Sequence, residues 1–184
     1  CNTTGVSNIA MGTCALRGNE TGSCNIAIGC GAGKVTTSTG SVLIGHQAGV
    51  AQTTAVNTAV GHQALANTTD GGENVAVGVQ ALLANDGGYQ NTAVGNAALA
   101  SNTEGLRNTA VGCGAAYSNT TGDNNVVIGC KAGYSNQTSN AIVAIGTDAL
   151  YNNLAAENVA VGSCAGYGNT TGTNNVAMGH KAMC

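Results

Sequence analysis

The chain carries eight cysteines, and thiols are the side chains best suited here to covalent chemistry. An even number of cysteines in a chain of 184 residues is typical of an oxidising, extracellular setting, with buried free thiols as the alternative. A metal site is not indicated, because no Cys-x-x-Cys occurs and the three histidines do not flank cysteines at ligand spacing. The cysteines are Cys1, Cys14, Cys24, Cys30, Cys113, Cys130, Cys164 and Cys184.

Six asparagines stand in the Asn-x-Thr pattern that accepts N-linked glycans. They are Asn2, Asn19, Asn67, Asn119, Asn136 and Asn169. Five of them share one position of the internal repeat described below, and Asn67 stands one position earlier. We therefore expect all six on one turn edge of the fold, with a row of glycans there if the source is a eukaryote or a eukaryotic virus. The alternative is that asparagine serves the geometry of the turn.

Catalytic constellations are not indicated. His46, His62 and His180 share one repeat position, but no acidic residue stands near them in sequence to orient an imidazole. The aspartates are scattered turn residues, and no glycine-rich phosphate loop occurs. Residues 60–65 resemble one hexapeptide unit of the acyltransferases with a left-handed β-helix, which need three such units per coil. We expect neither enzyme activity nor a cofactor.

Charge and composition argue against several classes of partner. Only 7% of the residues are charged, the net charge is −3, and the five basic residues are scattered, so we expect no nucleic-acid binding. No stretch approaches the roughly 18 consecutive apolar residues of a membrane span, so we expect no membrane insertion. The chain has 29 glycines and no proline, tryptophan or phenylalanine, and Ala and Val supply most of its apolar residues. Such small side chains predict a thin core, which suits a stacked architecture.

All these residues belong to an internal repeat of 16 or 17 residues that runs through the chain. Position 5 of the repeat is glycine and position 8 is alanine in all eleven copies, and position 4 is always Val, Ile or Met. Position 3 is alanine except at Leu43 and Val127. Position 1 of each copy falls on Asn8, Asn25, Ser41, Asn57, Asn74, Asn91, Asn108, Asn125, Ile142, Asn158 and Asn175.

Each repeat reads as one coil of a solenoid. Positions 2 to 4 alternate as a short strand, the glycine turns the chain, positions 7 to 11 predict a second short strand, and the rest is a turn. The fold class predicted is all-β, a parallel β-solenoid of eleven coils of 16–17 residues with two short strands each, in a single domain over residues 1–184. Thr58 and Val60 are expected to face the interior. Ala59 is expected to face outward, against neighbouring chains or a second sheet, or simply into solvent.

Stacked coils bring cysteines of neighbouring coils together. Cys113 and Cys130 occupy position 6 of adjacent coils, and the spacing of about 4.8 Å between stacked strands is within reach of a disulfide. Such bridges would offset part of the conformational entropy of a thin-cored chain, with free thiols as the alternative. The candidate pairs are Cys14–Cys30, Cys113–Cys130, Cys164–Cys184 and, from the two that remain, Cys1–Cys24.

The repeat also keeps its register from the last residue of one copy to the first residue of another. Cys184 falls on position 10 and Cys1 on position 11. This favours head-to-tail stacking, in which one copy completes the open coil of the next, because an uncovered solenoid end exposes unpaired strand groups. The alternative is a stretch of a longer array. In a stacked polymer Cys1 and Cys184 meet at an assembly joint, where an intersubunit disulfide can form.

The run Asn-(Val/Thr)-Ala-(Val/Ile)-Gly-x-x-Ala resembles the head repeats of trimeric autotransporter adhesins. It is also similar to repeats in phage and phage-like tail-fibre proteins and in surface glycoproteins of large algal viruses. In the fibre-type repeats this run alternates with an Asn-Thr-Thr-Gly turn, as in residues 108–122. The resemblance covers essentially the whole chain. It implies a left-handed parallel β-roll, often threefold, in an elongated surface appendage.

These features predict an extracellular structural glycoprotein whose subunits stack head to tail into a fibre. The alternative is a segment of a homotrimeric phage, viral or bacterial surface fibre or adhesin that mediates attachment. The expected partners are further copies of the chain, as a polymer or a trimer, and a surface glycan or receptor. The expected location is outside the cell or on the surface of a virion or cell. Ice binding is disfavoured, because Val75 interrupts the threonines that recur at position 2.

Overall fold

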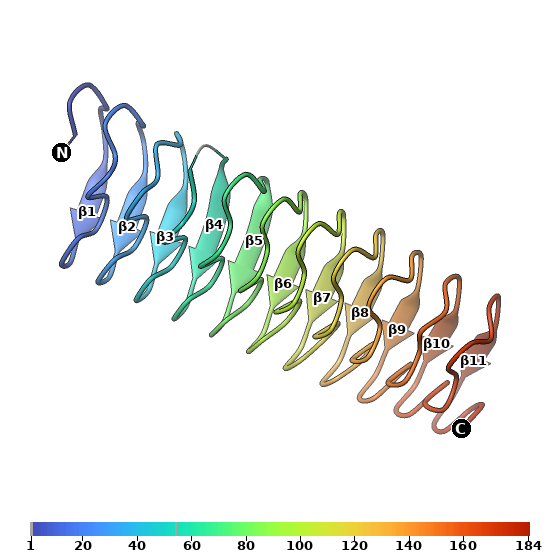
Figure 1. Ribbon diagram of the computed structural model, residues 1–184. Coiled ribbons are helices and arrows are strands. Elements are labelled where there is room, and N and C mark those ends of the chain that lie inside the picture. Colours follow the sequence, from blue (N-terminus) through green and yellow to red (C-terminus); the bar gives the residue numbers. More distant parts are fainter. Residues whose placement is uncertain (1, 54) are drawn as a thin grey trace.

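The computed structural model describes residues 2–53 and 55–184. In these residues eleven short strands form one parallel sheet in chain order, and the two chain termini lie at opposite ends of the row (Figure 1). This confirms the predicted fold class, an all-β parallel β-solenoid. The strands are β1 (Ile9–Met11), β2 (Ile26–Ile28), β3 (Val42–Ile44), β4 (Asn57–Val60), β5 (Asn74–Val77), β6 (Thr92–Val94), β7 (Thr109–Val111), β8 (Val126–Ile128), β9 (Val143–Ile145), β10 (Val159–Val161) and β11 (Val176–Met178).

Neighbouring strands pair position by position. Ala59 pairs with Ala76, and Ala76 pairs with Ala93. The coils of 16 residues keep the same strand register, since Ala27 pairs with Leu43 and Leu43 with Ala59. Each repeat position therefore forms a ladder along the rod with a rung spacing of about 4.8 Å, and eleven coils span roughly 50 Å.

The strand faces are the reverse of the prediction. Ala59 and the other residues at position 3 are buried, whereas Val75 and Val77, at positions 2 and 4 of β5, are 37% and 36% exposed. The expectation that Thr58 and Val60 face the interior was therefore wrong. The reason is the thinness of the coil: the wall opposite the strand lies so close that only a small side chain fits between, and the β-branched side chains turn outward.

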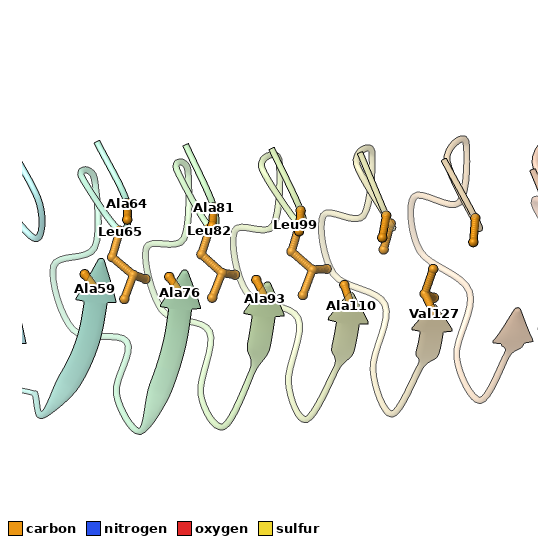
Figure 2. Close-up of a cluster of buried hydrophobic side chains, with 14 of the residues drawn as sticks. Ala59, Ala64, Leu65, Ala76, Ala81, Leu82, Ala93, Leu99, Ala110 and Val127 are labelled. Carbon is orange, nitrogen blue, oxygen red and sulfur yellow. The ribbon is translucent and has the colours of Figure 1, made fainter. Parts of the chain in front are cut away.

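The opposite wall consists of positions 8 and 9. In Figure 2, Leu65 and Leu82 reach from this wall toward the alanines of the strands. The two exceptions to alanine at position 3 are matched by glycine at position 9 of the same coil. A Cβ on Gly49 would lie 2.7 Å from Leu43, and one on Gly133 would lie 3.3 Å from Val127. The core thus keeps a constant width by exchanging volume between its two walls.

The predicted second strand of each coil is not found in the described residues. Positions 6 to 10 form turns in which Ala97 and Leu99 have left-handed φ angles of 54° and 50°. These turns still bond to neighbouring coils, since the N–H of Leu99 donates to the carbonyl of Ala115 at 3.0 Å. Alternate left-handed residues curve the chain more tightly than an extended strand, which closes the coil in a few residues.

Position 5 admits only glycine. Gly95 has φ +139°, and a Cβ built on it would lie 2.5 Å from the carbonyl oxygen of Gly112 in the next coil. The same close approach repeats from coil to coil along the sheet, from Gly12 to Gly162. The glycine ladder therefore allows the stacked backbones to turn the corner in contact with one another.

Candidate assembly surfaces

The described residues enclose no pocket, and among them no three His, Cys, Asp or Glu side chains gather as a group that could hold a metal ion. No helix in the same part of the chain is long and apolar enough to span a bilayer. The most regular features of these residues are surfaces and side-chain ladders.

The outward face of the sheet, which we call the strand face, is apolar along the whole rod. It consists of positions 2 and 4 of the eleven strands, and Val, Ile or Met fills nineteen of these twenty-two places, with threonine in the other three. The face is about 50 Å long and two side chains wide, which gives on the order of 500 Å². A contiguous apolar patch of this size lies within the range of the largest patch on soluble monomers, which is often functional, so the strand face is a candidate interaction surface.

The two ends of the described sheet form a second kind of surface. β1 and β11 each pair with one strand, and their side chains are the most exposed of the strand face, with Met11 at 60%, Val176 at 64% and Met178 at 71%. Inside the sheet, the N–H of Thr92 donates to the carbonyl of Asn108 in the following coil at 2.8 Å. Because all strands run in the same direction, a coil added beyond β11 would find the same arrangement of backbone N–H and carbonyl groups that pairs the strands inside the sheet.

Asparagines at position 1 form a buried amide ladder. The Oδ1 of Asn91 accepts the N–H of Asn108 at 2.9 Å, and its Nδ2 donates to the carbonyl of Gly105 at 2.7 Å. Asn91 is fully buried. The same bonds recur at Asn74 and Asn108, so a coil with asparagine at position 1 binds the next coil through a side chain as well as through the backbone. Ile142 has no such side chain and interrupts the ladder. The ladder has a direction, because each Oδ1 accepts only from the coil that follows.

A second amide ladder occupies position 12 and includes most of the predicted glycosylation sites. Asn119 is 1% exposed, and its Nδ2 donates to Asn102 Oδ1 at 2.8 Å and to the Gly122 carbonyl at 3.0 Å. Asn19 and Asn136 are equally buried and also donate their Nδ2 to a turn carbonyl. A glycan would replace a hydrogen on this nitrogen, and the folded coil has no room for it. The burial therefore argues against a glycan on these three asparagines in the folded coil, and glycosylation there stays a prediction to be tested.

The other three sequons lie differently. Asn67, one position earlier, is exposed, as is Asn2. Asn169 is partly exposed near the last coil, although its Nδ2 donates to Asn153 Oδ1 and to the Gly172 carbonyl, both at 2.9 Å. Glycosylation at Asn2, Asn67 and Asn169 stays a prediction.

The described cysteines are free thiols in this structure, and the disulfides predicted among them stay predictions. Cys113 and Cys130 are both exposed. The Cys184 Sγ donates to the Cys164 carbonyl at 3.2 Å, which places this candidate pair side by side. Cys1 lies outside the described residues, so its bond to Cys24 and the assembly joint with Cys184 stay predictions. The free thiols are Cys14, Cys24, Cys30, Cys113, Cys130, Cys164 and Cys184.

Aromatic rings stack on two corners of the rod. His46 and His62, at position 6, lie with ring centroids 5.2 Å apart and 8° between the planes. Position 10 carries four tyrosines in consecutive coils, which the sequence analysis did not single out. The signal was available, because the tyrosines recur at the repeat period. They are Tyr117, Tyr134, Tyr151 and Tyr167.

Comparison of the chain with known protein families, with curated proteins and with solved structures finds no match. Function is therefore argued from the surfaces and ladders of the molecule itself.

Proposed function

We propose that this chain is a structural subunit of an extracellular fibre, in which copies stack head to tail and continue the β-solenoid. The observation that supports this best is the register of the sheet, since every coil offers the same hydrogen-bonding pattern to the coil before it and the coil after it. A rod built this way repeats the same cross-section from coil to coil along residues 2–53 and 55–184. This regularity supports a structural role.

The direction of the amide ladder favours head-to-tail over head-to-head contact. Asn175, in the last described coil, donates its N–H and its Nδ2 to Asn158 Oδ1, at 3.0 Å and 3.1 Å. By the pattern of the other coils, the Asn175 Oδ1 accepts the N–H of Asn8 from a second copy. Two N-terminal ends brought together would place donors of this ladder opposite donors, and two C-terminal ends would place acceptors opposite acceptors, which costs buried hydrogen bonds.

Electron microscopy of the purified chain tests this proposal. We expect filaments with an axial repeat of roughly 50 Å, set by eleven rungs. Val176→Pro removes the N–H that would donate to the Asn8 carbonyl of the next copy and should abolish filaments. Val176→Thr is the matched control, because it keeps the N–H and the β-branched shape. Filaments that persist in the proline variant, or separate rods in the unmodified protein, would contradict stacking.

The strand face favours a second candidate, lateral association of copies into a homotrimeric fibre shaft or adhesin. Its apolar side chains are partly exposed in a single chain, and packing against two further copies would remove them from water. A homotrimer has closed threefold symmetry, so each chain offers the same surface to its neighbours.

Two exposed valines of one coil provide a matched pair for testing the strand face, because one lies on the face and the other lies outside it. Val77 is 36% exposed on the face, and Val79 is 43% exposed on the adjacent corner. We expect Val77→Lys to lower the oligomer mass measured by light scattering, because it places a charge in the contact, whereas Val79→Lys leaves the mass unchanged. A monomeric mass for the unmodified protein, or equal effects of the two lysines, would contradict lateral association.

The proposed location is outside the cell, or on the surface of a virion or cell. The exposed sequon at Asn67 and the eight cysteines support this proposal. If the chain belongs to a homotrimeric attachment fibre, the second candidate function, its proposed binding partner is a surface glycan or receptor.

A further inference from the structure

The tyrosines at position 10 form a continuous stack along one corner of the rod. Ring centroids are 5.1 Å apart between Tyr117 and Tyr134, 5.2 Å between Tyr134 and Tyr151, and 5.2 Å between Tyr151 and Tyr167. The planes of neighbouring rings differ by 8°, 4° and 14°. Stacked rings at this separation attract one another, so the ladder stabilises the coils that carry it.

Backbone bonds hold the tyrosines in register. The residue after each tyrosine donates its N–H to the carbonyl of the next tyrosine along the ladder, as from Ser118 to Tyr134 at 3.1 Å and from Ser135 to Tyr151 at 3.0 Å. The ring edges nevertheless reach solvent, since Tyr117 and Tyr167 are each 37% exposed and the two inner rings are partly exposed. The ladder thus combines a fixed spacing with access from outside.

We propose that this tyrosine ladder is a site of oxidative cross-linking, at which neighbouring phenols couple into dityrosine. A haem peroxidase with hydrogen peroxide takes one electron and one phenolic proton from each of two tyrosines. The two phenoxyl radicals join through a carbon–carbon bond between ring carbons ortho to the oxygens, and each ring hydrogen then moves to restore a phenol. Per bond, one peroxide accepts two electrons and two protons and becomes two water molecules.

The geometry makes this coupling a reaction between neighbours. Adjacent rungs hold the Cα atoms about 4.8 Å apart, so rotation of the two side chains brings their ring edges together, whereas rings two rungs apart are roughly 10 Å apart. Each bond would link two coils covalently and make the rod harder to unravel. The inference stands apart from stacking or trimerisation, because it needs only one chain.

The fifth tyrosine provides an internal comparison. Tyr89 is 42% exposed, so it is open to the same oxidant, but its hydroxyl donates to the Asp70 carbonyl at 2.6 Å. No ring is stacked on Tyr89 within residues 2–53 and 55–184. Exposure alone therefore predicts reaction at Tyr89, whereas adjacency predicts reaction only within the ladder.

Two double variants with equal numbers of tyrosines test adjacency. Y117F/Y134F leaves Tyr151 and Tyr167 as neighbours, and Y134F/Y167F leaves Tyr117 and Tyr151 two rungs apart. Phenylalanine keeps the ring stack and removes only the phenol. The dilute proteins, with thiols alkylated because thiols reduce phenoxyl radicals, are treated with peroxidase and hydrogen peroxide. We expect at least tenfold more dityrosine fluorescence in the monomer fraction of the first variant. Equal yields would overturn the proposal.

Peptide mapping of the unmodified chain gives a second readout that needs no variant. Cleavage after glutamate at Glu104 and Glu157 separates Tyr89 and Tyr167 from the other three ladder tyrosines. We expect peptides 105–157 and 158–184 joined with the loss of two hydrogens. Cross-links that involve the peptide carrying Tyr89 as often as the ladder peptides would show random coupling and overturn the proposal.

Discussion

The buried amide ladder makes a quantitative prediction for Asn91→Ala. The substitution removes two hydrogen bonds, one from Nδ2 to the Gly105 carbonyl at 2.7 Å and one from the Asn108 N–H to Oδ1 at 2.9 Å. The Gly105 carbonyl keeps a partner, because the Nδ2 of Asn102 also donates to it at 3.1 Å. The Asn108 N–H donates to Asn91 Oδ1, so the substitution leaves this buried N–H without an acceptor.

The expected cost follows from that orphaned donor. A buried N–H without an acceptor costs about 1–3 kcal/mol, and the lost bond to Gly105 adds a fraction of that. We therefore expect the free energy of unfolding to fall by about 2–3 kcal/mol. Asn96→Ala in the same coil is the matched control, because Asn96 is exposed, and exposed substitutions usually change stability by less than about 0.5 kcal/mol.

Urea unfolding of the monomeric chain measures both variants, and amide hydrogen exchange locates the effect. A loss of 2 kcal/mol at the Asn108 amide corresponds to roughly a 30-fold faster exchange there. If Asn91→Ala and Asn96→Ala shift the urea midpoint equally, the ladder contributes nothing beyond the backbone sheet. Unchanged exchange at Asn108 would refute the reasoning even if the global stability fell.

Three further predictions concern the corner glycines, the sequons and the thiols. Gly95→Ala should lower the free energy of unfolding by about 3 kcal/mol in urea titration, because it combines φ strain with a clash against a carbonyl of the next coil; wild-type stability would contradict the packing. After secretion from a eukaryotic cell, mass spectrometry should find sugar on Asn67 but none on Asn119, and glycosylated Asn119 in folded protein would exclude the buried ladder. The predicted disulfide of Cys113 and Cys130, 17 residues apart, should stabilise by about 3 kcal/mol; a urea midpoint unaffected by reductant would argue against it.

The fold was predictable from the sequence because the same residue types recur at the same positions in all eleven copies of the repeat. Glycine at position 5 is invariant for a physical reason that one coil already shows, the contact of Gly95 with the next coil. Alanine at position 8 has a separate reason, because Ala98 is fully buried in the wall opposite the strand. The positions of the strands could be predicted from the alternation of side chains. The turn that replaces the predicted second strand could not be predicted, because left-handed residues such as Leu99 carry no distinctive side chain and their φ angles arise from tight closure of the coil.

The orientation of the strand could not be read from alternation alone. Both faces of each strand are apolar, and a period of two separates the faces without saying which is inside. The deciding signal was size: Leu43 occurs with Gly49, and Val127 occurs with Gly133. Such paired exchanges of volume indicate two walls in contact, which places position 3 inside and the larger β-branched residues outside.

Three of the sequons are buried for a related reason. An Asn-Thr-Thr-Gly turn in isolation favours an exposed asparagine. In a stacked array the turn carbonyls also need partners, and Asn119 turns inward, where its Nδ2 donates to the Gly122 carbonyl and also to the side-chain Oδ1 of Asn102. Asn67 escapes this role because it stands one position earlier, which aims it at solvent. At Asn67 one residue of register is enough to expose the asparagine, whereas Asn2 and Asn169 share the ladder position and are more exposed because they lie near the two ends of the rod.

The reversed strand faces connect the two proposed modes of assembly. Hydrogen-bonded growth uses the edges of β1 and β11, and lateral packing uses the strand face, which lies at right angles to those edges. Neither contact occupies the atoms of the other. Head-to-tail stacking in register also joins the strand faces of successive copies into one unbroken apolar stripe. Lateral packing along that stripe would bridge each joint between copies and hold the stacked ends together. A charge at Val77 should therefore weaken filaments as well as trimers, whereas a charge at Val79 should affect neither.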